Sequence, residues 1–308
     1  MIENPLVPGS PVVVEREFPT SVLLEGYRER YGLDVGPLLA STDTVRVCRC
    51  GATGYRFYHP FDLAGDGAFY ARLQEHEYYM AWKWEHEACS GLIRDGDRIL
   101  EVGSGRGDFL EEMRRRRTGL DCTGLELNPG SPREEEGLRI VDSTVEEYAA
   151  SVAGRPPADV VCSFQALEHV PRVRSFLLAC IGLLREGGLL VLSVPDNDGF
   201  IRHKVGVLNM PPHHMGLWTG ESLRRIADHF DVELVDTLYE PLQPYHVDYW
   251  LEALYSRLFG HRLSRTAART VRLLGLRGAL RRWVGRRAGR MRGHTVMCVF
   301  RKRGEEAS

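Results

Sequence analysis

The sequence feature that most constrains the fold is a glycine-rich turn after a short apolar run. Residues 98–102 are mostly apolar, and Gly103, Gly105 and Gly107 follow at alternate positions before a helical pattern begins. Glycine permits the tight turn from a strand into a helix and lets a ligand approach the backbone closely. The turn therefore predicts a buried strand that ends at a nucleotide-type site, although glycine spacing alone is a weak motif.

A second apolar run ends in an acidic residue at the spacing expected of such a site. Residues 121–126 predict a strand that ends at Glu126, about twenty residues beyond the turn. A carboxylate in this position is suited to bind the hydroxyl groups of a ribose. Turn and acid together predict a nucleotide-binding α/β unit.

With these motifs, the chain resembles the class I S-adenosylmethionine-dependent methyltransferases from about residue 76 to 240. Residues 140–143 fall where that family places the acid that recognises the adenine amino group. Residues 159–170 look like its fourth strand and the turn beside the transferable methyl group, and residues 183–195 resemble its helix end, glycine turn and fifth strand. These three segments argue against a NAD-type Rossmann domain and against a nucleotide-binding domain without activity.

The resemblance implies S-adenosylmethionine as the cofactor and S-adenosylhomocysteine as the product. The residues that it implies for cofactor binding are Glu101, Gly103, Ser104, Gly105, Gly107, Glu126, Leu127, Asp142, Ser143, Phe164, Gln165, Tyr79 and Lys83.

The order of strand and helix patterns predicts the fold class. The two alternate from residue 97 to about 240, which is typical of a parallel sheet with helices on both faces. We expect an α/β fold with a Rossmann-like seven-stranded methyltransferase sheet, an N-terminal strand-rich element and a helical insertion before the last strand. The expected strands are residues 98–102, 121–126, 138–141, 158–163, 188–194, 231–239 and 295–300. The expected domains are an accessory region (1–75), the methyltransferase domain (76–242 with 294–303) and the insertion (243–293).

Composition bounds the class of protein. The chain has 308 residues, of which 43% are hydrophobic and 27% charged, as in ordinary soluble enzymes. Its net charge of −2 provides no overall attraction to nucleic acid. No signal-peptide pattern or long apolar run is present, and the seven cysteines are scattered, so we expect reduced thiols in a cytoplasmic protein.

The N-terminal region carries expectations about local structure. Residues 45–63 predict a hairpin, and residues 69–93 predict one helical segment rich in aromatic side chains. Methyltransferases that this chain resembles often carry zinc-binding Cys-x-x-Cys pairs before the methyltransferase domain. This chain departs from that pattern, because only Cys48 and Cys50 are present, one residue apart, with His59 nearby. A structural zinc ion needs four ligands, so we expect a metal-free remnant.

The insertion has an unusual charge. Residues 253–304 contain no Asp or Glu, and residues 257–292 contain twelve arginines, with leucines recurring near helical spacing. The pattern predicts one or two basic amphipathic helices beside the active-site edge of the sheet. Three functions stay open: a solvated cap or subunit contact, a surface for a membrane or an anionic ligand, and nucleic-acid binding, which the lack of a recognised motif disfavours.

Two histidine groups are candidates for removing a proton from an acceptor. Methyl transfer from a sulfonium to a hydroxyl needs a positioned acceptor and a base, and histidine has a suitable pKa. Glu168 and His169 follow the fourth strand, and His213 and His214 follow the fifth in a proline-stiffened loop. Either group could instead be structural, the first as a helix start and the second as an exposed loop. The four residues could also hold a divalent cation, an alternative that we do not favour.

The histidine loop also narrows the resemblance. A Pro-Pro-His-His segment at residues 211–214, followed by an aromatic residue and a helix start, is similar to bacterial methyltransferases encoded beside polysaccharide and secondary-metabolite genes. That resemblance implies O-methylation of a sugar or other polyhydroxylated small molecule in glycan or natural-product biosynthesis. C-methylation of a keto-sugar and a catalytically inactive binding scaffold are the alternatives. As partner we expect a small-molecule or carbohydrate acceptor; a phosphate-bearing or lipid-linked acceptor, peripheral membrane contact and an oligomer are further options.

Overall fold

The computed structural model describes residues 2–74, 80–127, 133–152, 154, 156–204 and 206–304, and its centre is a mixed eight-stranded sheet. The strand order is β11-β12-β9-β8-β4-β5-β7-β6. The strands are β4 (Arg98–Val102), β5 (Asp121–Leu125), β6 (Arg133–Glu135), β7 (Leu138–Val141), β8 (Ala158–Phe164), β9 (Leu184–Pro195), β11 (Val232–Pro241) and β12 (Arg292–Lys302). The α/β Rossmann-like fold is confirmed, with the seven expected strands present and the short edge strand β6 added.

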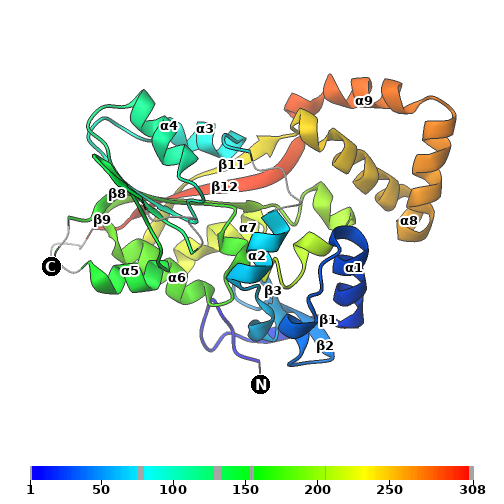
Figure 1. Cartoon of the computed structure of the whole chain (residues 1–308), viewed down its shortest axis with the longest axis horizontal. Helices are drawn as coiled ribbons and strands as arrows, with labels where there is room; N and C mark the ends of the chain where they lie inside the picture. The colour runs from blue at the N-terminus through cyan, green and yellow to red at the C-terminus, as the bar shows by residue number, and fades with distance from the viewer. Residues whose placement is uncertain are drawn as a thin grey trace.

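Helices cover both faces of this sheet (Figure 1). α3 (Trp84–Ser90) and α4 (Asp108–Arg116) lie on one face, and α5 (Val145–Ser151), α6 (Val173–Gly182) and α7 (Gly220–Arg224) lie on the other. The five central strands run parallel, and β12 returns antiparallel between β9 and β11. The chain leaves β4 toward β5 on one side and comes back to β8 on the other. In an open α/β sheet this reversal opens a crevice at the carboxyl ends of the strands, where ligands bind.

A second, four-stranded antiparallel sheet forms most of the N-terminal region. It contains β1 (Val12–Pro19), β2 (Thr44–Cys50), β3 (Arg56–His59) and β10 (Gly216–Leu217), with α1 (Ser21–Tyr31) between the first two strands. The expected hairpin is confirmed, because β2 pairs with β3. Strand β10 directly follows the loop that carries His213 and His214, so this sheet is joined to the histidine loop.

The expectation of one helical segment over residues 69–93 is wrong. The described residues instead form α2 (Gly67–Gln74) and α3, which begins after an extended backbone at Lys83 (φ −123°, ψ 171°). The amide of Lys83 donates to Nδ1 of His86 at 3.3 Å, so the side chain of the third helical residue caps the start of α3.

The insertion between β11 and β12 contains two helices, α8 (Val247–Leu273) and α9 (Arg277–Gly285). Gly260 has non-helical angles (φ 72°, ψ 163°) and divides α8 into two arms. The first arm packs through Val247 and Leu251 on Phe200 and Ile201, which follow β9. Within the described ranges, no helix combines the length and hydrophobicity needed to span a bilayer.

Candidate functional site

The glycine turn is held against the end of β5 by backbone hydrogen bonds. The amides of Gly103 and Ser104 both donate to the backbone oxygen of Leu125, at 2.9 and 3.0 Å. The amide of Gly105 donates to Oε2 of Glu126 at 2.8 Å. The predicted turn and the predicted acid therefore meet at one point on the carboxyl edge of the sheet.

Two positions of the turn require glycine. Gly103 has φ +79°, and a Cβ there would lie 2.7 Å from Cβ of Ala166, just after β8. Gly107 has φ +82°, and a Cβ there would lie 2.8 Å from Cδ1 of Ile140 in β7. At Gly103 both the backbone conformation and the neighbouring Cβ exclude a side chain, whereas at Gly107 the positive φ does so, since the end of the Ile140 side chain can shift.

The residue after β8 is held in a left-handed conformation. Gln165 has φ 53°. In the part of the chain that the structure describes, it is the only residue other than glycine with a positive φ. Such a conformation costs about 1–3 kcal/mol and persists where the surrounding structure imposes it, often at functional sites. Phe164, just before it, is buried and packs edge-to-face on Phe109 at 4.9 Å between ring centroids. The structure thus brings Phe164 and Gln165 to the edge that carries the glycine turn.

Three buried carboxyl groups interact electrostatically with Lys83 at this edge. Burial raises the pKa of Glu168 to about 8, and it also raises the pKa of Glu85 and, by a wide margin, that of Glu101. The ammonium group of Lys83 opposes the effect at all three carboxyls. One oxygen each of Glu101 and Glu168 is buried without a hydrogen-bond partner in the described part of the chain. The positive charge of Lys83 therefore offsets part of the effect of burial at these three carboxyl groups.

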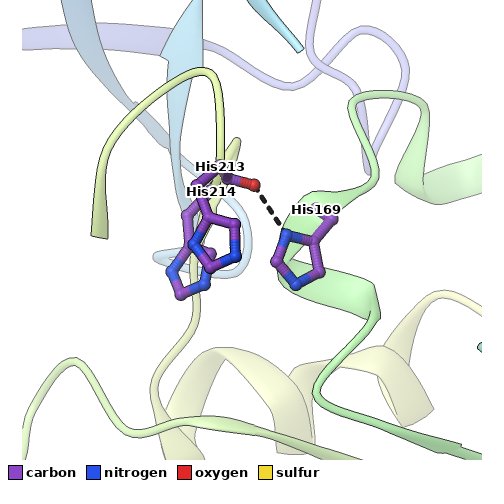
Figure 2. A group of neighbouring side chains, drawn as sticks. All are labelled: His169, His213 and His214. Atoms are coloured by element: carbon purple, nitrogen blue, oxygen red, sulfur yellow. Dashed lines mark hydrogen bonds between the residues drawn. The ribbon is translucent and has the colours of Figure 1, made fainter. Parts of the chain in front are cut away.

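The three histidines form one cluster (Figure 2). The ring centroid of His169 lies 4.6 Å from that of His213 and 4.9 Å from that of His214. The rings of His213 and His214 stack on each other with their centroids 4.5 Å apart. Burial lowers the pKa of all three rings, to about 3 for His213. The cluster is therefore neutral at physiological pH.

Hydrogen bonds determine which ring nitrogens carry protons. Nδ1 of His169 lies 2.6 Å from the backbone oxygen of His213, and Nδ1 of His213 lies 2.9 Å from that of Leu208, so both nitrogens donate. Asn209 donates through Nδ2 to Asn197 and so presents its Oδ1 to Nδ1 of His214 at 3.0 Å. With Nδ1 protonated, each neutral ring has its lone pair on Nε2.

The cluster is also a candidate metal site. One ring nitrogen from each histidine lies within 4.8 Å of the others, and imidazole is a common ligand of divalent cations. The rings of His213 and His214 stack with 18° between their planes, which disfavours a shared ion because the lone pair of each ring lies in the plane of that ring.

A family model described as "Methyltransferase domain" matches residues 74–237, more than half of the chain. The chain belongs to this methyltransferase family. The resemblance to class I methyltransferases that the motifs indicated is thereby confirmed.

Curated relatives match a smaller part of the methyltransferase. Ubiquinone biosynthesis O-methyltransferases from Escherichia coli O127:H6 and Shigella boydii serotype 18 are each 36% identical over 122 residues, which cover 37% of this chain and 48% of theirs. The chain thus spans about half the length of the curated relatives it matches. A solved structure with partial similarity is the 1,6-didemethyltoxoflavin-N1-methyltransferase of Burkholderia thailandensis (TM-score 0.47, 16% identity, 77% of this chain, 86% of that one).

The turn region fits the cofactor of the class I family, S-adenosylmethionine. Beside the glycine turn, Oε2 of Glu101, Oγ of Ser104 and Oδ2 of Asp108 are buried and have no protein partner among the described residues. Polar atoms in that state favour a bound polar ligand, because burial without a hydrogen bond costs free energy. The sequence singled out two of these three residues and missed Asp108, the first residue of α4.

The other expected cofactor residues lie at the same edge with fewer contacts. Asp142 is exposed after β7, Ser143 donates to the backbone oxygen of Thr144 at 2.9 Å, and Leu127 is 58% exposed after β5. Tyr79 lies outside the described residues.

Sequence reasoning missed polar residues that reach the site from distant parts of the chain. Glu240, at the end of β11, is buried and accepts hydrogen bonds from the amides of His294 and Thr295 at 3.0 and 3.1 Å. Asn197 and Asn209 orient His214, as described above. None of these three residues belongs to a motif. Only their positions, at a strand end or in the histidine loop, could have marked them as site residues.

The cysteines of the N-terminal region lie apart from this cluster. Cys48 and Cys50 are buried with free thiols, on or at the end of β2. Among the residues described, the histidine cluster is the one group of three or more candidate metal ligands. The metal-free state of Cys48 and Cys50 stays a prediction.

Proposed function

We propose that this methyltransferase transfers a methyl group from S-adenosylmethionine to a hydroxyl group of a sugar or another polyhydroxylated small molecule, in glycan or natural-product biosynthesis. The bound cofactor supplies a methyl group activated by a positively charged sulfur. The chain itself has to place the acceptor hydroxyl in line and accept its proton. The observation that carries the proposal is the neutral histidine cluster at the edge that carries the glycine turn.

In this proposal His213 or His214 is the general base. Each has its Nδ1 proton engaged and its Nε2 lone pair available, so it can accept a hydrogen bond from a hydroxyl group and then its proton. His169 is a positioning residue, because its Nδ1 donates to the backbone of His213 and ties the turn after β8 to the histidine loop. Glu168 stays largely protonated and buried beside them, since burial raises its pKa to about 8.

Two further observations support an oxygen acceptor and its class. The curated relatives are named O-methyltransferases, although they match only part of this chain. Next to the acceptor edge, a hollow between the segment after β9 and α8 is lined by Arg202, His203, Arg257, Arg292, Trp250 and Asp198. Asp198 pairs with Arg202 at 2.9 Å, and Asp196 pairs with Arg292. Guanidinium groups bind phosphate bidentately, and Arg257, which has no carboxylate within ion-pair distance in the described part of the chain, supports an acceptor that carries phosphate. The seven free, buried cysteines support a cytoplasmic location.

The test is methyl transfer to a panel of free and phosphorylated sugars, keto-sugars and other polyols. We expect product from hydroxyl acceptors and a loss of about 10²–10⁴ in kcat for His213→Ala or His214→Ala. His229→Ala, outside the cluster, is the matched control and should keep the wild-type rate. The rate should fall on the acid side only well below pH 6.5, because the pKa of each candidate base is lowered.

Three outcomes would contradict parts of the proposal. Products methylated at carbon from keto-sugars alone would favour C-methylation. Cofactor binding without turnover of any acceptor would favour a binding scaffold. Activity that a chelator removes and a divalent cation restores would assign the histidines to a metal; we expect the chelator to leave the rate unchanged.

A further inference from the structure

The insertion carries an exposed apolar turn at its far end. The distal arm, defined here as residues 258–290, extends away from the central sheet along α8 and returns along α9 toward the start of β12 (Figure 1). At the turn from α8 into α9, Leu273, Leu274 and Leu276 are 77%, 65% and 52% exposed. Consecutive exposed leucines of this kind mark an interaction site in a soluble protein.

A second apolar group lies at the kink of α8. Leu258, Phe259 and Leu263 surround Gly260 and are 62%, 51% and 61% exposed. Trp283, on α9, is 49% exposed and lies under the guanidinium of Arg287 at 4.6 Å from the ring centroid. Both ends of the second arm of α8 therefore present apolar side chains to solvent.

Arginines without acidic partners flank these apolar groups. Asp248 pairs with Arg277 and Arg281, at 3.2 and 3.1 Å, and so holds α9 against the start of α8. In the described part of the chain, no carboxylate lies within ion-pair distance of several other arginines of the arm, namely Arg269, Arg272, Arg282, Arg286, Arg287 and Arg290. Their mutual repulsion requires an anionic partner or solvent.

We propose that the distal arm docks on the surface of a bilayer that contains anionic lipids. An amphipathic helical segment with leucine and tryptophan beside arginine binds in the interface, where its apolar side chains enter the acyl boundary and its cations meet the headgroups. The complete absence of acids from residue 253 to 304 fits an anionic surface. The arm lies on the surface without spanning it, in agreement with the lack of a spanning helix among the described residues.

The arm is built to dock as a preformed unit. Val284 of α9 is fully buried in the same apolar cluster as Val247 and Leu251 of α8 and Phe200. Docking therefore needs no unfolding of the insertion. The inference goes beyond the proposed function and does not depend on which acceptor is methylated.

The test is cosedimentation of the full chain with vesicles. We expect it to pellet with phosphatidylcholine vesicles that contain about one third phosphatidylglycerol, to pellet much less with phosphatidylcholine alone, and to be released as salt rises above about 0.3 M. Changing Arg269, Arg272 and Arg286 to Gln should lower the partition coefficient on the order of a hundredfold, at about fivefold for each arginine near the surface. Changing Leu273, Leu274 and Leu276 to Asn should lower it by at least about tenfold.

Matched controls and a second measurement keep the proposal falsifiable. Val22→Asn with Leu178→Asn changes apolar side chains that are 46% and 49% exposed elsewhere, and it should leave pelleting unchanged. Failure of the wild-type chain to pellet with anionic vesicles at low salt overturns the proposal, as does equal pelleting of the arm variants. A dimer in sedimentation velocity that the leucine variant dissociates, without vesicle binding, also overturns it, since the apolar turn is then a subunit contact.

Discussion

Glu168 shows at the scale of one residue how burial favours the protonated form of a carboxyl group. Its carboxyl group is 1% exposed, and burial raises its pKa to about 8 against an ordinary value of 4.5. Between these two pH values the unfolded chain releases this proton while the native chain retains it. The free energy of unfolding therefore falls as pH rises between the two pKa values, by up to about 1.4 kcal/mol for each pH unit.

Replacing Glu168 by Gln should remove this pH dependence. We expect the variant to gain stability relative to wild type as pH rises from 5 to 8, with the gain largest near pH 8. The measurement is Tm against pH for both proteins; buried histidines act in the opposite direction but equally in both, so they cancel in the difference. Exposed Glu186→Gln is the control. Parallel Tm curves for wild type and Glu168→Gln would show that Glu168 is not held protonated by the fold.

At the scale of elements, the N-terminal region holds the histidine loop in place. Hydroxyl groups of three tyrosines donate to backbone oxygens of that loop: Tyr27 to Met210 at 3.1 Å, Tyr58 to Asn209 at 3.0 Å, and Tyr70 to His213 at 3.0 Å. Just beyond the loop, Trp218 stacks on Tyr55 at 4.0 Å between ring centroids. The small sheet is therefore part of the site, because it fixes the segment that carries the proposed base.

Tyr58→Phe isolates one of these contacts. Losing the hydrogen bond to Asn209 should lower the free energy of unfolding by about 0.5–1.5 kcal/mol. Because Asn209 orients His214, kcat should also fall several-fold while the affinity for S-adenosylmethionine stays unchanged. Tyr148→Phe, on α5, serves as control. A stability loss without any change in kcat would limit the N-terminal sheet to a structural role.

At the scale of the whole molecule, the central sheet could be predicted from the sequence and the contacts between its loops could not. Parallel strands are buried on both faces, so each is a short apolar run in the sequence. The glycine turn identifies the first of these strands, from which the others can be assigned in order. The break at Lys83 was missed because the aromatic pattern continues across it. The bond from Tyr58 to Asn209 joins residues 151 positions apart, a separation at which no local pattern acts.

Within the site, the place of the histidines could be predicted from the sequence, but their protonation pattern could not. Their place after two adjacent strands was predictable, because carboxyl ends of parallel strands meet at one edge. Their tautomers were not, since these depend on Leu208 and on the pair Asn197 and Asn209.

The cofactor site at the glycine turn is tested most directly by a calorimetric titration with S-adenosylmethionine. Wild type is compared with Glu126→Ala and with Glu134→Ala, an exposed acid on β6. We expect one site in the wild-type chain and an affinity about ten- to hundredfold weaker in Glu126→Ala, since hydrogen bonds to a charged group contribute about 1–3 kcal/mol. Glu134→Ala should bind as wild type does. Unchanged affinity in Glu126→Ala, or no binding by the wild-type chain, would contradict the placement of the cofactor at the glycine turn.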